Sequence, residues 1–126
     1  MMFLFSFFRV ATSAGAYSRE MPIWCVNPYK LNVSGFKFSY QKGVGASSFS
    51  IAVYRDNTKA VKIAELLNIG AGKTHGVSEV YSSNFLSDQE ITATSNPLFV
   101  EITNTESLGI INLDTHVHLI QQAHQN

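Results

Sequence analysis

The sequence has little cysteine and little charge, and each shortage excludes a class of protein. Cys25 is the one cysteine among 126 residues, so no disulfide can form within the chain. Because Cys25 lies in the apolar run 23–26, we interpret it as a small buried residue; a catalytic thiol needs a nearby base and partial exposure. Charged residues make up 14% of the chain and hydrophobic residues 45%, the reverse of the balance in disordered proteins. We therefore expect one globular domain with its own core.

Long apolar runs are also missing. The apolar stretch at residues 1–8 is far too short to span a bilayer, so we expect no transmembrane segment. Its basic residue, Arg9, follows the apolar stretch, whereas a secretory signal places basic residues first. Residues 14–16 would nevertheless make a cleavage site, and residues 1–19 contain no acid, as in a transit peptide. An upstream extension before a start at Met21 is a third interpretation.

A fourth interpretation is an ordered N-terminal arm, covering residues 1–20, that contacts a neighbouring subunit. It rests on four phenylalanines within six positions, which would be unfavourable in water. The interaction residues that it predicts are Phe3, Phe5, Phe7 and Phe8. We expect residues 1–20 to be such an arm or a removable segment, residues 21–122 to be the folded domain, and residues 123–126 to be a frayed tail.

What is present in the body of the chain is alternation with a period of two, which puts one set of side chains on a core face and the other on a solvent face. Gly35 interrupts the alternation, as a β-bulge would. Residues 60–69 also contain good helix formers, but we interpret them as a strand that pairs back on residues 48–54. The expected strands are 31–34, 36–41, 48–54, 60–69, 77–81, 89–94, 98–103 and 110–121. About eight strands at this spacing predict an all-β, single-domain antiparallel β-sandwich of jelly-roll or Greek-key type.

The same alternation predicts which side chains meet in the core. We expect the loop residues Phe85 and Leu86 to turn inward as well. The expected core consists of Trp24, Val26, Leu31, Val33, Phe36, Phe38, Tyr40, Phe49, Ile51, Val53, Ile91, Leu98, Val100, Ile102, Val117 and Leu119.

The net charge is zero but unevenly distributed along the chain. Residues 1–63 hold eight basic and two acidic side chains, for a charge of +6, and residues 64–126 hold one basic and seven acidic ones, for a charge of −6. One interpretation is that strands from the two halves pair, so that their charges neutralise each other across the sheets. The other is a polarised surface that favours head-to-tail association.

Residues 114–118 contain the most suggestive run of polar side chains. On a strand, Asp114, His116 and His118 share one face, and two imidazoles with a carboxylate can bind a divalent metal ion. The run resembles the His-x-His motif of amidohydrolase metal barrels. Such enzymes need a large barrel to supply their other ligands, so we carry no catalytic role over. The alternatives are a small metal site, completed by His75, Glu79 or a second subunit, and polar residues on the wet face of a strand.

Three other short motifs resemble functional sites, but the residues around them do not support the function. The run Gly70–Thr74 ends in Gly-Lys-Thr, but the earlier glycine of a phosphate-binding loop is replaced by Leu67, and no helix is expected to follow. Residues 36–42 mix aromatic and basic side chains, yet strand geometry puts the aromatic ones and Lys37 on opposite faces, so nucleic acid is an unlikely partner. The tripeptide 32–34 fits a glycosylation acceptor and is significant only in a secreted protein.

These features favour a non-enzymatic structural or interaction protein that assembles with itself, as a homo-oligomer, or with a larger particle such as a virion or a phage head or tail. An alternative is a module that binds a carbohydrate or small ligand through loops 41–48, 70–76 and 82–88, with Tyr54, Tyr81 or Trp24 stacking on a sugar. A second alternative is a metal-binding protein using Asp114, His116 and His118. We expect no cofactor other than that possible divalent metal, and we favour a virion or extracellular location.

Overall fold

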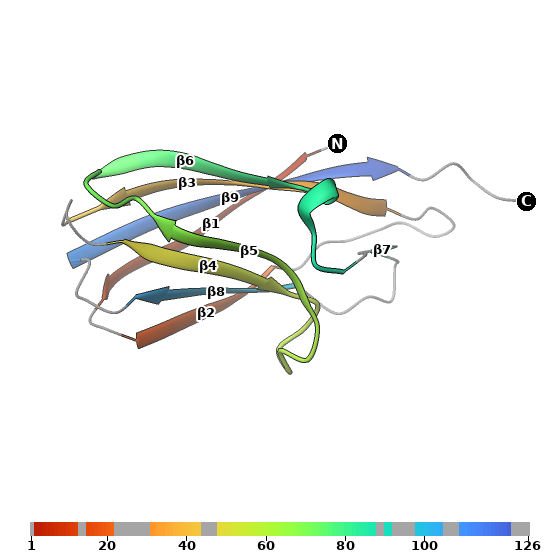
Figure 1. Cartoon of the computed structure of the whole chain (residues 1–126), viewed down its shortest axis with the longest axis horizontal. Helices are drawn as coiled ribbons and strands as arrows, with labels where there is room; N and C mark the ends of the chain where they lie inside the picture. Colours follow the sequence, from red (N-terminus) through yellow and green to blue (C-terminus); the bar gives the residue numbers. More distant parts are fainter. Residues whose placement is uncertain are drawn as a thin grey trace, which may run out of the picture.

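The computed structural model describes residues 2–12, 15–21, 31–43, 48–87, 90–91, 98–104 and 109–121. It confirms the all-β prediction, with two antiparallel sheets that form a sandwich (Figure 1). The elements are β1 (Met2–Thr12), β2 (Gly15–Met21), β3 (Leu31–Lys42), β4 (Phe49–Tyr54), β5 (Lys62–Ile69), β6 (His75–Tyr81), the 3₁₀ turn η1 (Ser82–Asn84), β7 (Glu90–Ile91), β8 (Leu98–Asn104) and β9 (Gly109–Gln121).

The strand order is that of a jelly roll. Sheet A has the order β1-β9-β3-β6, with the short β7 also paired to β3, and sheet B has the order β2-β8-β4-β5. Leaving β7 aside, the first strand pairs with the last, the second with the second-last, and so on inward to β4 with β5. Figure 1 shows this nesting as strands from the two ends of the chain lying side by side, β1 against β9 and β2 against β8. Such nested pairs, folded across two sheets, define the double Greek key of the jelly roll.

The core lies between the sheets and is built from alternate residues of most strands. In β4 and β8 every second side chain is buried, as a period of two requires. Of the expected core, the following residues are buried: Val33, Phe36, Phe38, Tyr40, Phe49, Ile51, Val53, Leu98, Val100, Ile102 and Val117. Trp24 and Val26 lie outside the described residues, and the side chains of Leu31, Ile91 and Leu119 are not among those described.

Alternation did not predict all of the core. Ile63 and Ala64 are adjacent in sequence and both buried, because the β4–β5 ladder shifts register between Val53 and Tyr54 and leaves Ile63 as an extra residue. The loop residue Phe85 turns inward as expected, with its ring 5.6 Å from that of Phe36. The expectation for its neighbour Leu86 was wrong: this side chain is 62% exposed.

The bulge expected at Gly35 is present in the β3–β9 ladder. Val33 pairs with Leu119 and Gly35 with His118, so Ser34 is the extra residue between them. The Ser34 hydroxyl donates a hydrogen bond of 3.1 Å to the backbone carbonyl of His118, which ties the bulge to the neighbouring strand. The extra residue shifts the alternation of β3 by one position, so Val33 before the bulge and Phe36, Phe38 and Tyr40 after it all face the core.

The N-terminal residues differ from the expectation of an arm. Residues 2–12 form the edge strand β1 along β9, and residues 15–21 form β2 along β8, so the sandwich begins well before residue 21. The physical reason is that the backbone groups of these two segments pair antiparallel with β9 and β8, which makes them strands of the two sheets. Phe3, Phe5 and Phe8 stand opposite Val117, Thr115 and Leu113, and Phe7 lies at a register shift. Their side chains are not among those described.

The structure shows no helix in its described part that is long and apolar enough to cross a membrane. Cys25 and the tail 123–126 lie outside the described residues.

Candidate functional site

The outer face of sheet A carries the polar residues that the sequence singled out. Asp114, His116 and His118 lie on one face of β9 as predicted, exposed or half-buried, while Thr115 and Val117 between them are buried. The register places Asp114 beside Ser39 and His116 beside Lys37 on β3. The face is therefore a mixed polar surface in which a lysine stands next to a histidine.

A metal site gains no support from this arrangement. Within the described residues, no three His, Cys, Asp or Glu side chains are grouped as a metal ion requires. Of the two completing residues considered, Glu79 accepts a hydrogen bond from Tyr81, and His75 stands on β6, beyond β3. The His116 Nδ1 atom is buried without a hydrogen-bond partner in the described part of the structure. Metal binding by Asp114, His116 and His118 stays a prediction.

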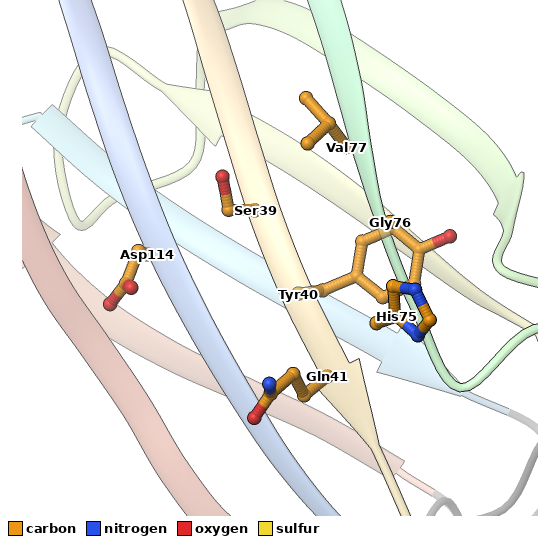
Figure 2. A pocket seen from close by; sticks show the side chains of 7 residues that line it. All are labelled: Ser39, Tyr40, Gln41, His75, Gly76, Val77 and Asp114. Carbon is orange, nitrogen blue, oxygen red and sulfur yellow. The ribbon is translucent and has the colours of Figure 1, made fainter.

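A shallow depression of about 370 Å³ lies on the same face, at the end where β3 stops and β6 starts. Figure 2 shows Asp114 on β9, Ser39 and Gln41 on β3, and His75 on β6 around it. These groups offer a carboxylate, an amide, a hydroxyl and an imidazole, which suits a small polar ligand. The loops 41–48 and 70–76 of the carbohydrate hypothesis thus come together here in their described parts.

Among its described lining residues, the depression presents no exposed tyrosine, tryptophan or phenylalanine ring on which a sugar could stack. Tyr40 is buried, and its ring lies against Gly76 (Figure 2). The same ring packs edge-on against Phe49 at 5.3 Å. Tyr81, another tyrosine considered for stacking, is half exposed, but its ring covers Gly35 on the neighbouring strand. Each tyrosine thus fills the space above a glycine across the β3–β6 ladder, a structural role.

Lys42 closes the end of the sandwich beside this depression. Its side chain is buried, its Nζ donates a hydrogen bond of 2.5 Å to the Gly70 carbonyl, and its backbone N–H donates one of 2.7 Å to the Thr74 carbonyl. The Gly-Lys-Thr run is therefore a turn joining β5 to β6, with Gly70 and Gly72 at positive φ and a strand, not a helix, after it. This geometry agrees with the rejection of a phosphate-binding loop.

Burial lowers the pKa of Lys42 from its usual 10.5. The unfolded chain therefore holds this proton more tightly than the folded one, and the stability that depends on Lys42 rises with pH between the folded pKa and 10.5. We expect the free energy of unfolding of the wild type, relative to Lys42→Met, to increase as pH approaches 10.5 from below. Urea unfolding of both proteins at several alkaline pH values checks this; a pH-independent difference would contradict it.

Basic side chains from the first half of the sequence lie close to acidic side chains from the second half in the folded structure. Lys59 forms an ion pair with Glu101, and Lys62 forms one with Glu65; each pair joins a base from residues 1–63 to an acid from residues 64–126. Glu101 also accepts a hydrogen bond from Ser18 on the next strand. Nested pairing mixes the two halves of the chain in both sheets, so the structure favours neutralisation over a polarised surface.

On the outer face of sheet B, each of these lysines lies over an aromatic ring. The Nζ atoms of Lys59 and Lys62 each lie 5.9 Å from an aromatic ring centre, over Phe99 and Tyr54 respectively. The register sets Tyr54 beside Phe99 on adjacent strands. Tyr54 is therefore occupied by a lysine of its own chain, which leaves it less open to a sugar.

One lateral edge of the sandwich exposes large apolar side chains. It is formed by β5, the last strand of sheet B, and β6, the last strand of sheet A, which contact each other and are joined by the 70–74 turn. Among the residues whose side chains the structure describes, the exposed large hydrophobic ones lie in or beside these two strands. They are Val61, Leu67, Val77, Tyr81 and Leu86, with exposed fractions between 37% and 63%. We call this surface the β5–β6 edge; periodicity could not reveal it, because which strands lie at an edge is decided by pairing.

Comparison with known proteins supports the fold and goes no further. No family model matches this sequence, and no curated protein is significantly similar to it. The structure of tomato aspermy virus matches all of this chain and 81% of that chain, at 12% identity and a TM-score of 0.52. At that identity the similarity shows a jelly-roll sandwich alone.

Two further structures match less well. The C-terminal CBM6 of LamC, a marine laminarinase from Zobellia galactanivorans, matches over 94% of this chain and 100% of that one, at 8% identity and a TM-score of 0.44. The decameric BFDV capsid protein matches over 96% and 94%, at 13% identity and a TM-score of 0.36.

Proposed function

We propose that this chain is a non-enzymatic structural subunit that assembles with copies of itself, as the jelly-roll subunits of a particle do. The observation that carries the proposal is the β5–β6 edge, where exposed apolar side chains lie on two neighbouring edge strands, Val77 on the outer face of sheet A and Leu67 on the outer face of sheet B. Exposed apolar surface is favourable to bury, at about 25 cal/mol per Å² removed from water, and a partner that covers this edge would bury it. The fold, which a virus coat structure shares, is compatible with such a role.

The charge distribution favours association through apolar contact at the β5–β6 edge over association through attraction between oppositely charged surfaces. The ion pairs Lys59–Glu101 and Lys62–Glu65 are satisfied within one chain, so these four side chains are not left to attract a second copy. Within the described residues, the depression beside Asp114 offers a polar ligand some hydrogen-bonding groups but no stacking surface. The carbohydrate-binding alternative therefore has less support than assembly.

Sedimentation velocity of the full chain tests the proposal. We expect species larger than the 13.9 kDa monomer at micromolar concentration. The double variant Leu67→Ser and Val77→Ser, which makes the edge polar on both strands, should raise the dissociation constant by about tenfold or more, since each 1.4 kcal/mol of lost burial is a factor of ten. Thr103→Ser, at an exposed site on the interior strand β8, is the matched control and should change nothing. A wild-type chain that stays monomeric throughout would overturn the proposal.

A further inference from the structure

The free edge of β6 is the least protected of the sheet edges. Natural edge strands are usually blunted by bulges, by lysine or arginine, or by a covering segment, because an open edge can pair with another chain. The β1 ladder contains a register shift and β1 carries Arg9, and β2 carries Arg19. The ladder of β5 has two register shifts, and two of its backbone carbonyls accept hydrogen bonds from the segment after η1.

Over the residues that the structure describes, β6 has none of these devices. Its ladder with β3 runs without a shift from Gly35–Tyr81 to Gln41–His75, and it contains no lysine, arginine or proline. Within the described part of the chain, β3 is the only strand paired with it, and Figure 1 shows it as the outermost strand of sheet A. It also contributes Val77 and Tyr81, which are 54% and 50% exposed, to the β5–β6 edge.

We propose that β6 pairs antiparallel with β6 of a second copy of this chain, about a two-fold axis through Ser78, so that the two copies of sheet A join into one sheet. The inference rests on the proposed function and names the contact by which that assembly begins. The joined sheet would have the order β1-β9-β3-β6, followed by the same four strands of the second copy in reverse, a size that open sheets reach.

The register follows from strand geometry. Along a strand, successive residues point their backbone N–H and C=O groups to alternate sides of the strand. In an antiparallel pair, two residues that stand opposite each other either both point these groups toward the partner strand or both point them away from it. A two-fold axis that relates two identical paired strands must therefore lie midway between the two copies of one residue. It cannot set a residue opposite its neighbour in the sequence. Full overlap of residues 75–81 places this axis at Ser78, the central residue of β6.

This register makes the strand complementary to itself. It sets His75 opposite Tyr81 of the second copy, Gly76 opposite Val80, and Val77 opposite Glu79. On the outer face, the Val77 methyl groups would lie against the methylene carbons of Glu79 of the second copy, and His75 would stand beside Tyr81, whose own ring stays over Gly35. On the inner face, each small residue meets a larger one or, at Ser78, another small one, so no two large side chains oppose each other.

Disulfide trapping tests the register directly. In a Cys25→Ser background, Ser78→Cys places two cysteines opposite each other on the axis, at the separation of a cross-strand pair, about 5 Å between Cβ atoms. We expect a mild oxidant to convert most of the assembled protein into disulfide-linked dimers. Ser83→Cys is the matched control: it introduces the same change at an exposed position in η1, past the end of β6, where the two copies lie at opposite ends of the paired strands. It should remain monomeric on a non-reducing gel.

Amide hydrogen exchange gives a second measurement that needs no substitution. Amides of β6 should exchange at least about tenfold more slowly at concentrations where sedimentation shows association than at dilutions where it does not, as newly bonded backbone groups do. If the chain sediments as a monomer, the proposed function and this contact fail together. If it associates but Ser78→Cys does not cross-link and the β6 amides are unchanged, the assembly stands and β6 pairing is refuted. Equal cross-linking at Ser83→Cys would equally refute the register.

Discussion

Replacing Phe36 with alanine is expected to lower the free energy of unfolding by about 3–5 kcal/mol, a large fraction of the stability of a small domain. Phe36 is fully buried, and its ring lies 6.1 Å from that of Phe38 and 5.6 Å from that of Phe85. Removing it leaves a cavity between β3 and the loop after η1 that rigid strands cannot close. Urea denaturation, with an unchanged dependence on urea concentration, would measure the loss.

Phe99→Ala is the matched control for this cavity. Phe99 is only half-buried, on the outer face of sheet B, and its ring carries the Lys59 ammonium group rather than core side chains. Truncation there removes partial burial and a cation–π contact, for an expected loss of about 1–2 kcal/mol. Equal losses at the two positions would show that the core is not where alternation and packing place it.

Replacing Gly76 with alanine is expected to cost about 1–3 kcal/mol by overpacking. A Cβ atom at this position would lie 2.6 Å from the hydroxyl oxygen of Tyr40 and 2.9 Å from its Cζ atom. The tyrosine ring has little room to retreat, because it packs against Phe49 and its other side lies 3.0 Å from where a side chain on Gly70 would begin. Thermal unfolding should show a lower midpoint, since a small domain loses several degrees per kcal/mol.

A second substitution at Tyr40 can distinguish a clash with the tyrosine from a constraint on the backbone at position 76. Tyr40→Phe removes the hydroxyl that the new methyl group meets, so Gly76→Ala should cost about 1 kcal/mol less in the Tyr40→Phe background than in the wild type. If the cost is the same in both backgrounds, the tyrosine is not the obstacle, and the Gly76 position is constrained by its backbone.

The candidate site divides into parts that local pattern could predict and parts that it could not. The shared face of Asp114, His116 and His118 followed from the period of a strand, which any extended chain has. That Asp114 would line a depression with His75, or that Tyr81 would cover Gly35, depended on β3 lying between β9 and β6. No local signal carries that information, because it concerns residues dozens of positions apart.

The N-terminal residues are a second case in which local sequence pattern could not predict strand pairing. Their apolar character suggested an arm or a removable segment, because apolar side chains are unfavourable in water and the sequence alone does not show which other strand would bury them. In the structure, residues 2–12 and 15–21 are the strands that pair with β9 and β8, near the other end of the chain. The bulge that buries both Ile63 and Ala64 arises in the same way, from the register of one strand on another.

The sequence alone determined that this protein is an all-β sandwich, which strands it contains in the main body, and many of the side chains of those strands that face inward, because these depend on alternation within each strand. Only the tertiary structure decided the nested pairing, the mixing of the two charged halves and the identity of β6 as an open edge. Those properties belong to the spatial order of strands, which is set by the joint packing of the whole core and by no one segment of it.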